Sequence, residues 1–198
     1  LKVPEKNIRI IYCGLSENFL NPQRTDTAVI RSKYHLPEDY LLCLSTLEPR
    51  KNMQLLLHAY ESLYLAGKIT SPLVLAGRKG WKIEQMLEEI QKHGDIPVTV
   101  TGFIEDEDLP AIYQMAKCFV FPSIYEGFGI PPLEAMAMGV PVLSSDSSCL
   151  PEILGDGAVY FRDQDEEDLK RRLLEIEQGT VDLSEKKQKA GERCKAFV

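Results

Sequence analysis

One stretch, LLCLSTLEPRKNMQLLLHAYESLYLAGKITSPLVLAG at residues 41–77, decides the fold of this chain. It opens on the apolar run 41–44 and closes on a second apolar run at 73–76. Between the two runs, apolar side chains recur from Leu55 to Tyr64 at the spacing of an amphipathic helix. Short continuous apolar runs are typical of strands that are buried on both faces of a parallel sheet. The stretch therefore predicts a strand, a crossover helix and a second, parallel strand.

The same alternation continues to the end of the chain. Further strands are predicted at 97–101, 118–121, 140–143 and 158–161, which makes six with the two above. Helices are predicted between and after them, at 81–93, 109–116, 133–138, 149–154, 165–178 and 184–197. Strands that alternate with helices predict a Rossmann-like, three-layer α/β/α domain with a six-stranded parallel sheet. Such sheets bind ligands beyond the carboxyl ends of their strands, so we expect functional residues just after each strand.

The first part of the chain, residues 1–39, departs from this regular pattern and is interpreted as a lead-in and interdomain linker. It contains a predicted strand at 8–12, then Gly14, then a short predicted helix at 28–34 that ends before Pro37. The regular domain is predicted to run from residue 40 to residue 198.

The composition is that of an ordinary globular domain and excludes several classes of protein. Of 198 residues, 44% are hydrophobic and 27% are charged, which argues against disorder, collagen and coiled coil. The formal net charge of −7 argues against a nucleic-acid-binding surface. No apolar run approaches the roughly 18 residues that span a bilayer. The 5 cysteines include no CxxC pair, so we expect reduced thiols and no zinc site.

The most informative segment, residues 122–134, follows a predicted strand and opens a predicted helix. Gly127 and Gly129 allow a tight turn and a close approach of the backbone to a ligand. The backbone N–H groups of residues 128–130 would then lie at a helix N-terminus, where anions bind. The prolines that follow suit a first helical turn, whose N–H groups have no partner within the helix.

Glu126 and Glu134 stand eight residues apart and bracket this turn. A carboxylate can accept two hydrogen bonds from the vicinal hydroxyls of a ribose or a hexose. The alternative is a glycine-rich turn with one solvated and one capping glutamate. The combination of strand, turn, prolines and both glutamates favours the ligand site.

Two cations, Arg50 and Lys51, follow the strand at 41–44 and suit a diphosphate. The alternative is a solvated basic pair, although the dipole disfavours cations at a helix start. After the third predicted strand, the segment 101–104 contains a glycine and an aromatic residue whose ring could pack on a nucleotide base. The alternative is an ordinary strand end with a buried aromatic side chain. Gly77 and Arg78 hold the equivalent position after the second strand, as ligand contacts or as an ordinary turn.

Three nucleotide-binding and hydrolytic motifs are missing from the sequence. It has no Walker loop, no G-x-G-x-x-G after a strand and no G-x-S-x-G. Their absence disfavours a P-loop enzyme, a dinucleotide-binding fold and a serine hydrolase.

Together these motifs resemble the C-terminal, donor-binding domain of the retaining glycosyltransferases of family four, which have a GT-B fold. The family's E-x7-E signature is matched by Glu126 and Glu134, its phosphate-clamp element by residues 48–52, and its Gly-Phe by Gly102 and Phe103. The resemblance covers about residues 40–178. It implies that the domain is half of a GT-B fold, and that an N-terminal acceptor domain and a final helix are absent from this chain.

The resemblance also implies a role for each site residue. Lys51, helped by Arg50, would contact the diphosphate, together with the backbone of residues 128–130. Glu134 would bind the nucleotide ribose and Glu126 the donor sugar, while Phe103 and Ile104 would line the base pocket. On this resemblance the catalytic residues are Glu126, Lys51 and Arg50, and the substrate-binding residues are Glu134, Gly127, Phe128, Gly129, Ile130, Phe103, Ile104 and Thr46. One position departs from the family, because many relatives have Gly-Arg where this chain has Ser45-Thr46.

The function implied is transfer of a hexose from a nucleotide-diphosphate sugar to an acceptor in polysaccharide or glycolipid synthesis. GDP-mannose is favoured over a UDP-hexose as the donor. Lys51, Arg50 and a helix N-terminus could neutralise the leaving diphosphate in place of a metal, so we expect no metal and no other cofactor. The expected partners are the nucleotide sugar and the acceptor domain, at a cytoplasmic location or the inner face of a membrane. The alternatives are a non-catalytic nucleotide-sugar binding module and a GT-B epimerase or hydrolase of nucleotide sugars.

Overall fold

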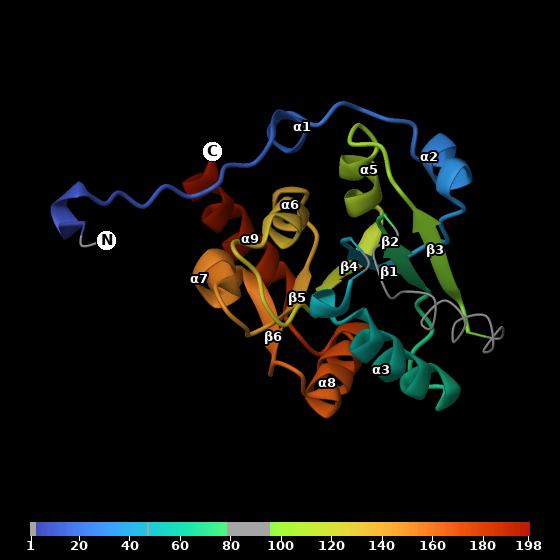
Figure 1. The fold of residues 1–198 in the computed structure, drawn as a ribbon. Coiled ribbons are helices and arrows are strands. Elements are labelled where there is room, and N and C mark those ends of the chain that lie inside the picture. The colour runs from blue at the N-terminus through green and yellow to red at the C-terminus, as the bar shows by residue number, and fades with distance from the viewer. Residues whose placement is uncertain (1–2, 47, 79–95) are drawn as a thin grey trace.

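Six parallel strands form one sheet in the order β3-β2-β1-β4-β5-β6 (Figure 1). The structure is a computed structural model and describes residues 3–46, 48–78 and 96–198. The strands are β1 (Tyr40–Leu44), β2 (Leu73–Ala76), β3 (Val98–Gly102), β4 (Ala116–Phe121), β5 (Val142–Ser145) and β6 (Ala158–Phe161). The prediction of a Rossmann-like, three-layer α/β/α domain with a six-stranded parallel sheet is confirmed.

Helices cover both faces of the sheet (Figure 1). On one face lie α3 (Met53–Leu65) and α8 (Glu166–Glu177). On the other lie α5 (Leu109–Gln114), α6 (Ile130–Ala137), α7 (Leu150–Leu154) and α9 (Leu183–Cys194). Two short helices of the lead-in, α1 (Glu17–Leu20) and α2 (Thr27–Tyr34), cross over this second face. The predicted helix at 81–93 lies outside the described residues.

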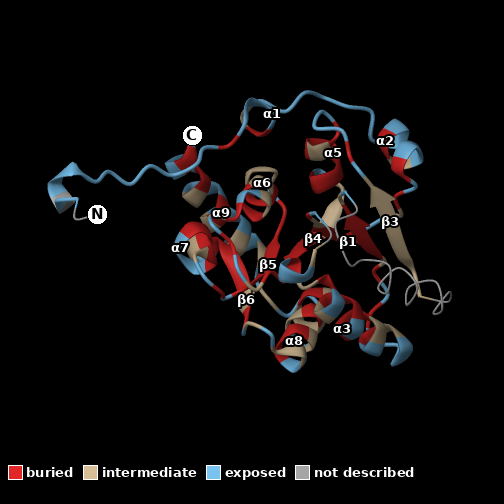
Figure 2. Ribbon diagram, viewed as in Figure 1, coloured by how far each residue is buried: buried red, intermediate tan, exposed pale blue. Residues whose placement is uncertain are grey.

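Strands β1, β2, β4, β5 and β6 are largely buried, as the apolar runs predict, whereas β3 at the edge of the sheet is half-buried along its length (Figure 2). Alternation along β1 divides the core, because Tyr40 and Leu42 pack under α5 and α6 while Leu41 and Cys43 pack under α3 and α8. All five cysteines are free thiols. No helix of the described residues is long and apolar enough to cross a membrane.

The lead-in differs from the prediction in one element. Residues 8–12 are extended but are not a strand, because within the described chain no neighbouring strand pairs with them. Ile10 and Ile11 are 82% and 87% exposed. The following part of the lead-in packs on the domain, where Leu15 and Phe19 are buried and the Leu15 N–H donates to the carbonyl oxygen of Phe197 at 2.9 Å.

Several element boundaries also differ from the sequence prediction, such as the start of α6 at Ile130 rather than at residue 133. The helix predicted at 109–116 ends at Gln114, because the chain enters β4 at Ala116. β5 begins at Val142 rather than at residue 140, because the Val140 N–H still donates to the carbonyl of Ala135 at the end of α6. The last helix breaks at Cys194 into a short 3-10 turn.

The strand order places β1 beside β4 at the centre of the sheet, where consecutive connections run in opposite directions. In open parallel sheets, ligands bind beyond the carboxyl ends of the strands at this switch point. The loops that follow β1 and β4 are therefore where a site is expected.

Candidate functional site

The loops after β1 and β4 lie against each other at the switch point. The Ile124 N–H, after β4, donates to the carbonyl oxygen of Arg50, after β1, at 2.9 Å. Arg50 and Lys51 lie in the 3-10 turn Pro49–Lys51, which is capped by Asn52 with a left-handed φ of 53°. This turn directs both cations toward the segment 122–134.

Both cations pair with Glu126, 75 or 76 positions along the chain. The Lys51 Nζ lies 2.6 Å from Glu126 Oε1, and both side chains are only 9% exposed. The Arg50 Nη1 donates to Glu126 Oε2 at 3.2 Å, and its Nη2 lies 2.6 Å from Glu48 Oε1. Two cations thus face two carboxylates, and Glu126 is the counter-ion of the pair predicted to bind a diphosphate.

A group of serines and a cysteine beyond β5 holds the Glu126 loop in place. The Glu126 N–H donates to Ser148 Oγ at 3.1 Å, and the Cys149 thiol donates to the Glu126 carbonyl oxygen at 3.3 Å. Ser145 and Ser147 both donate to the carbonyl oxygen of Ser123, at 2.6 and 2.8 Å. The sequence analysis did not predict a role for these residues. Their position at the carboxyl end of a buried strand was a signal for one, because parallel sheets bind ligands beyond the carboxyl ends of their strands.

Gly129 sets the start of α6. It precedes the helix with φ 99°, and a Cβ there would lie 2.7 Å from the Leu150 Cδ2 atom. Only glycine fits this backbone without strain. The ring of Phe128 packs against Tyr12 and Phe197, with centroids 5.9 and 5.7 Å away, so the phosphate contact predicted for this residue depends on its backbone N–H.

A pocket of about 310 Å³ opens beside Lys51, at the carboxyl ends of β1, β2 and β3. It is lined by Leu44, Ser45, Thr46, Lys51, Gly77, Arg78, Phe103, Ile104, Asp106, Leu109 and Pro131. The loops after β1 and β2 touch here, since a Cβ at Gly77 would lie 1.9 Å from the Ser45 carbonyl oxygen. The guanidinium of Arg78 lies over the Phe103 ring, 4.2 Å from its centroid. One pocket is thus lined by the Lys51 cation, the Phe103 ring and apolar side chains such as Ile104.

Glu134, one helical turn after Pro131, is largely buried and accepts a hydrogen bond from the Tyr113 hydroxyl at 3.0 Å. Burial raises the pKa of the Glu134 carboxyl to about 7, and the nearby Asp106 charge raises it further, against the effect of the Tyr113 bond. The two glutamates of the segment therefore have unlike surroundings: Glu126 faces cations and Glu134 faces a tyrosine.

The predicted site residues thus separate into three groups. Lys51, Thr46, Phe103 and Ile104 line one pocket. Glu126 is connected to this pocket by its ion pair with Lys51, and Arg50 pairs with the same carboxylate. Glu134 lies beside the pocket. In the glycine turn, Gly127 and Ile130 are exposed, Gly129 is buried, and the Phe128 ring packs against Phe197. Within the described ranges, no cluster of three or more His, Cys, Asp or Glu side chains is arranged to hold a metal ion.

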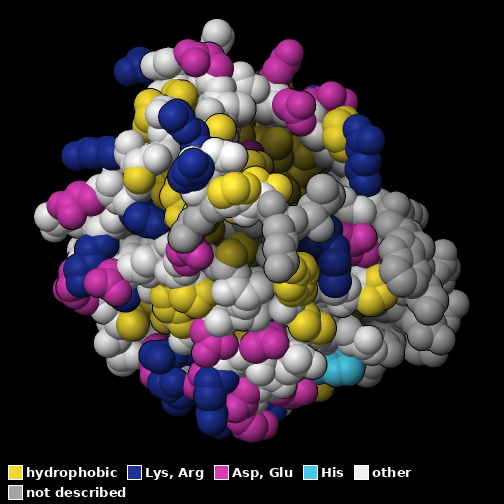
Figure 3. Space-filling model, turned by 60° about the vertical axis from the view of Figure 1, so that its left-hand side comes forward, with side chains coloured by type: hydrophobic (Ala, Val, Ile, Leu, Met, Phe, Trp, Pro, Cys, Tyr) yellow, Lys and Arg dark blue, Asp and Glu magenta, His cyan; other side chains and the backbone are white. Residues whose placement is uncertain are grey.

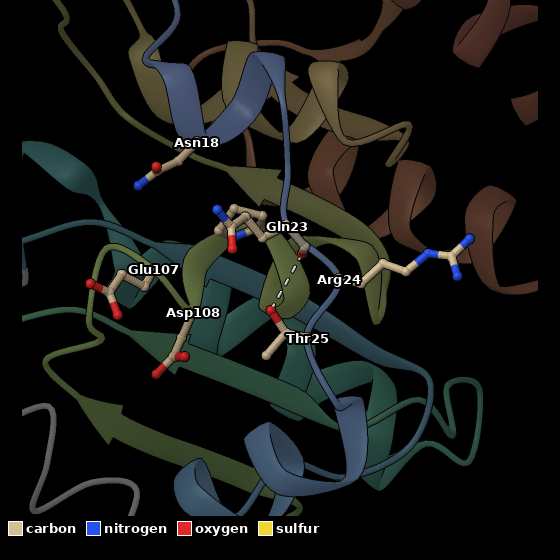
Figure 4. Close-up of a pocket in the computed structure, with 7 residues that line it drawn as sticks. Asn18, Gln23, Arg24, Thr25, Glu107 and Asp108 are labelled. Atoms are coloured by element: carbon tan, nitrogen blue, oxygen red, sulfur yellow. Dashed lines mark hydrogen bonds between the residues drawn. The ribbon is translucent and has the colours of Figure 1, made fainter.

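A second pocket, of about 460 Å³, lies between the lead-in and the start of α5 (Figure 4). Asn18, Gln23 and Thr25 line it from the lead-in, with Glu107 and Asp108 opposite, while the Arg24 side chain points away from these two carboxylates. Asp108 is already bonded to the Lys33 ammonium and the Tyr34 hydroxyl, each at 2.7 Å. These bonds tie α2 to α5, so Asp108 has a structural role.

Charged side chains of both signs are mixed on the face drawn in Figure 3, around an opening with a hydrophobic floor. This face carries no single-sign field that would attract a polyanion. Attraction of an anionic ligand to the candidate site would therefore depend on the local cations Lys51 and Arg50.

The family described as "Glycosyl transferases group 1" matches residues 26–196. The chain is 36% identical, over 87% of its length, to "O-antigen chain mannosyltransferase B" of Escherichia coli, and covers 46% of that protein. It is 40% identical, over 74% of its length, to the E. coli "Serotype-specific mannosyltransferase WbdA", and covers 18% of it. The chain therefore spans about half, or less, of the length of these curated relatives.

Solved structures agree with the fold. Sucrose-phosphate synthase from Thermosynechococcus elongatus superposes with a TM-score of 0.76 at 27% identity, over 96% of this chain and 48% of that one. Anabaena HepE, solved in complex with UDP, superposes with a TM-score of 0.76 at 18% identity, over 96% of this chain and 53% of its own. The second likeness is one of fold alone. Both place this domain within chains about twice as long.

Proposed function

This chain belongs to the glycosyl transferases of group 1, and from that premise we propose that it is the donor-binding domain of a retaining transferase. The donor would be a nucleotide-diphosphate sugar, GDP-mannose in our reading, and the acceptor a growing polysaccharide. The names of the bacterial relatives support mannose and O-antigen synthesis. Retention of configuration rests on the resemblance of Glu126 and Glu134 to the family signature.

The pocket beside Lys51 carries this proposal. Cleavage of a bond between a sugar and a diphosphate develops negative charge on the leaving diphosphate. Preorganised cations in a partly dry site stabilise such charge without reorganisation at the moment of reaction. Lys51 is held by a short turn and is almost fully buried, so its ammonium is positioned before any ligand arrives. The N-terminus of α6 adds backbone N–H groups near the same loop.

Glu126 would change partners on binding. In the free chain its two oxygens contact Lys51 and Arg50. A diphosphate that reaches these cations replaces the carboxylate as their counter-ion, which leaves Glu126 to accept hydrogen bonds from sugar hydroxyls. Because Lys51 and Arg50 supply the positive charge, we also propose that binding needs no metal ion.

Titration calorimetry with GDP, UDP and inorganic pyrophosphate, in the presence of EDTA, tests the proposal. We expect binding of at least one nucleoside diphosphate, and Lys51→Met should weaken it by about 1–3 kcal/mol, which is a loss of about fivefold to 150-fold. Lys33→Met is the matched control, since Lys33 pairs with Asp108 away from the pocket. Absence of binding by a folded chain contradicts the proposed function. Binding restored only by a divalent cation contradicts metal independence alone.

The nature of the product separates the remaining alternatives. A transferase delivers the hexose to a saccharide acceptor, whereas a nucleotide-sugar hydrolase releases free sugar. A binding module does neither. Mass analysis of the products formed from a donor sugar with and without a mannosylated acceptor distinguishes the three.

A further inference from the structure

Tyr113 is a buried tyrosine whose hydroxyl is fixed at the edge of the candidate site. It lies in α5 and is fully buried, with its ring edge-on to Phe19 and Phe119 at centroid distances of 5.8 and 5.3 Å. Its hydroxyl donates to Glu134 Oε2 at 3.0 Å. The Tyr113 ring thus packs against aromatic rings on two sides, and its hydroxyl is directed at Glu134 Oε2.

Glu134 does not itself line the pocket, but it lies next to residues that do, and the charge of the lining residue Asp106 acts on its carboxyl. Its helix neighbour Pro131, three residues earlier and on the same helix face, lines the pocket. Helical side chains lean back toward the N-terminal turn, which here is the turn that Pro131 occupies. Among the described residues, Tyr113 is the hydrogen-bond partner of this carboxylate, and it uses one of the two oxygens. The other oxygen, Oε1, has no partner in the described part of the chain.

We propose that Tyr113 is a positioning residue of the nucleotide site, whose hydroxyl fixes Oε2 of Glu134 so that the ionised carboxylate is ready to accept hydrogen bonds from a ribose diol. This inference rests on the function proposed above and adds a second residue to the ribose site. It also makes nucleotide affinity depend on pH. A protonated carboxyl donates one hydrogen bond and accepts poorly, so only the ionised form serves the diol fully.

The surroundings of Glu134 support a transition in the neutral range. Burial raises the pKa of the carboxyl to about 7, and the hydrogen bond from Tyr113 opposes that rise. Asp106, before α5, also raises this pKa. Of the other titratable groups on the elements packed against α6, the Cys194 thiol contacts the Leu133 carbonyl of α6 itself. Several more have partners away from Glu134: Arg193 with the Ile153 carbonyl, Lys186 with the Asp156 carbonyl, Lys189 with Glu185, Glu17 with Asn21, Glu152 with Tyr12, and Lys117 with Glu177. Tyr113 is therefore the neighbour that favours ionisation.

The test compares Tyr113→Phe with Tyr40→Phe, a control that also removes one buried hydroxyl. Tyr40 donates to the Ile112 carbonyl, so its loss affects α5 but not Glu134. We measure GDP affinity by calorimetry from pH 5.5 to pH 8.5, with unfolding by urea as the measure of folding. Tyr113→Phe should lower affinity about fivefold at pH 7. It should also move the midpoint of the pH profile upward, so that most of the affinity returns at pH 8.5.

Tyr40→Phe should keep the wild-type midpoint whatever it does to stability. A carbon-13 titration of the Glu134 carboxyl provides a readout without ligand, in which Tyr113→Phe should raise the pKa of Glu134. An unchanged carboxyl pKa, or an unchanged pH profile of binding, overturns the role of Tyr113. If the wild type binds no nucleoside diphosphate at any pH, the proposed function fails and this role fails with it. If GDP binds and only the Tyr113 effects are absent, the proposed function stands.

Discussion

Glu134 and Glu177 lie at opposite edges of the same sheet, and their carboxyl pKa values are displaced in opposite directions. Glu134, at the carboxyl edge, has one hydroxyl as partner and a pKa raised to about 7. Glu177, at the end of α8 beside the amino edge, accepts from the backbone and hydroxyl groups of Thr70 and Ser71 and from the Lys117 ammonium. Burial alone would raise its pKa, but these donors lower it to about 2.

The difference separates a structural carboxylate from one held ready for a ligand. Glu177 has its hydrogen-bonding capacity filled by its own chain, so it stabilises the fold by tying α8 to β2 and β4. Glu134 is largely removed from water but accepts only the hydrogen bond from Tyr113 among the described residues, and this incomplete pairing lowers the stability of the free chain. Groups with such unfilled capacity cluster at functional sites, where a ligand supplies what the fold leaves out.

Removal of the saturated carboxylate should have the largest effect. Glu177→Ala leaves the Lys117 ammonium and the donors of Thr70 and Ser71 without their acceptor, and we expect a loss of about 3 kcal/mol in the free energy of unfolding. Urea unfolding at pH 7 measures it. The control is Glu175→Ala, on the same helix, whose partners Arg171 and Arg172 are 51% and 29% exposed, so its pairs should be worth less, about 0.5 kcal/mol. Equal losses for the two variants would remove the distinction drawn for Glu177.

The stability that the Glu177 carboxylate contributes should be lost in acid. Because the native pKa of Glu177 is lowered, its stabilisation is fully present above the ordinary glutamate pKa of 4.5 and is lost as pH falls toward 2. The stability gap between the wild type and Glu177→Gln should be about 2 kcal/mol at pH 7. It should close between pH 4.5 and pH 2. A gap that persists at pH 2 would show that packing, and not charge, accounts for it.

Glu134→Gln should raise the stability of the folded chain, whereas Glu177→Gln should lower it. Because the native pKa of Glu134 is raised, ionisation above pH 4.5 penalises the folded chain, fully so above pH 7. We expect the variant to be more stable than the wild type by about 1–2 kcal/mol at pH 8 and equal to it near pH 4. Its affinity for GDP at pH 8 should fall about tenfold. A variant that is less stable at pH 8 would contradict the comparison with Glu177.

Glu126→Gln should show the smallest effect. Removal of the counter-ion of Lys51 and Arg50 should tighten pyrophosphate binding about threefold to tenfold, because no carboxylate then competes for the cations. Glu48→Gln, which frees only the exposed Arg50, should change affinity less. Calorimetry at two salt concentrations measures both. Weaker pyrophosphate binding by Glu126→Gln would show that the carboxylate orients the cations rather than competes with the ligand.

Most of the architecture could be predicted because it depends on local patterns. The runs at 41–44, 73–76 and 118–121 are apolar on both pleat faces, and only a strand within a covered parallel sheet buries both. The strand predicted at 8–12 was wrong because a run rich in isoleucine forms a strand only where a partner strand exists. The partnership of Glu126 with Lys51 joins positions 75 residues apart, and no local pattern indicates it.

The sequence by itself determined the order of strands and helices, the glycine turn before α6 and the identity of the charged groups that follow each strand. These properties follow from hydrophobic periodicity and backbone stereochemistry, which act over a few residues. Only the tertiary structure decided that Glu126 is paired with two cations, that Tyr113 rather than a cation contacts Glu134, and that Phe128 packs against Phe197. Contacts of this kind depend on which strands are neighbours, and burial then sets the charge of each carboxyl.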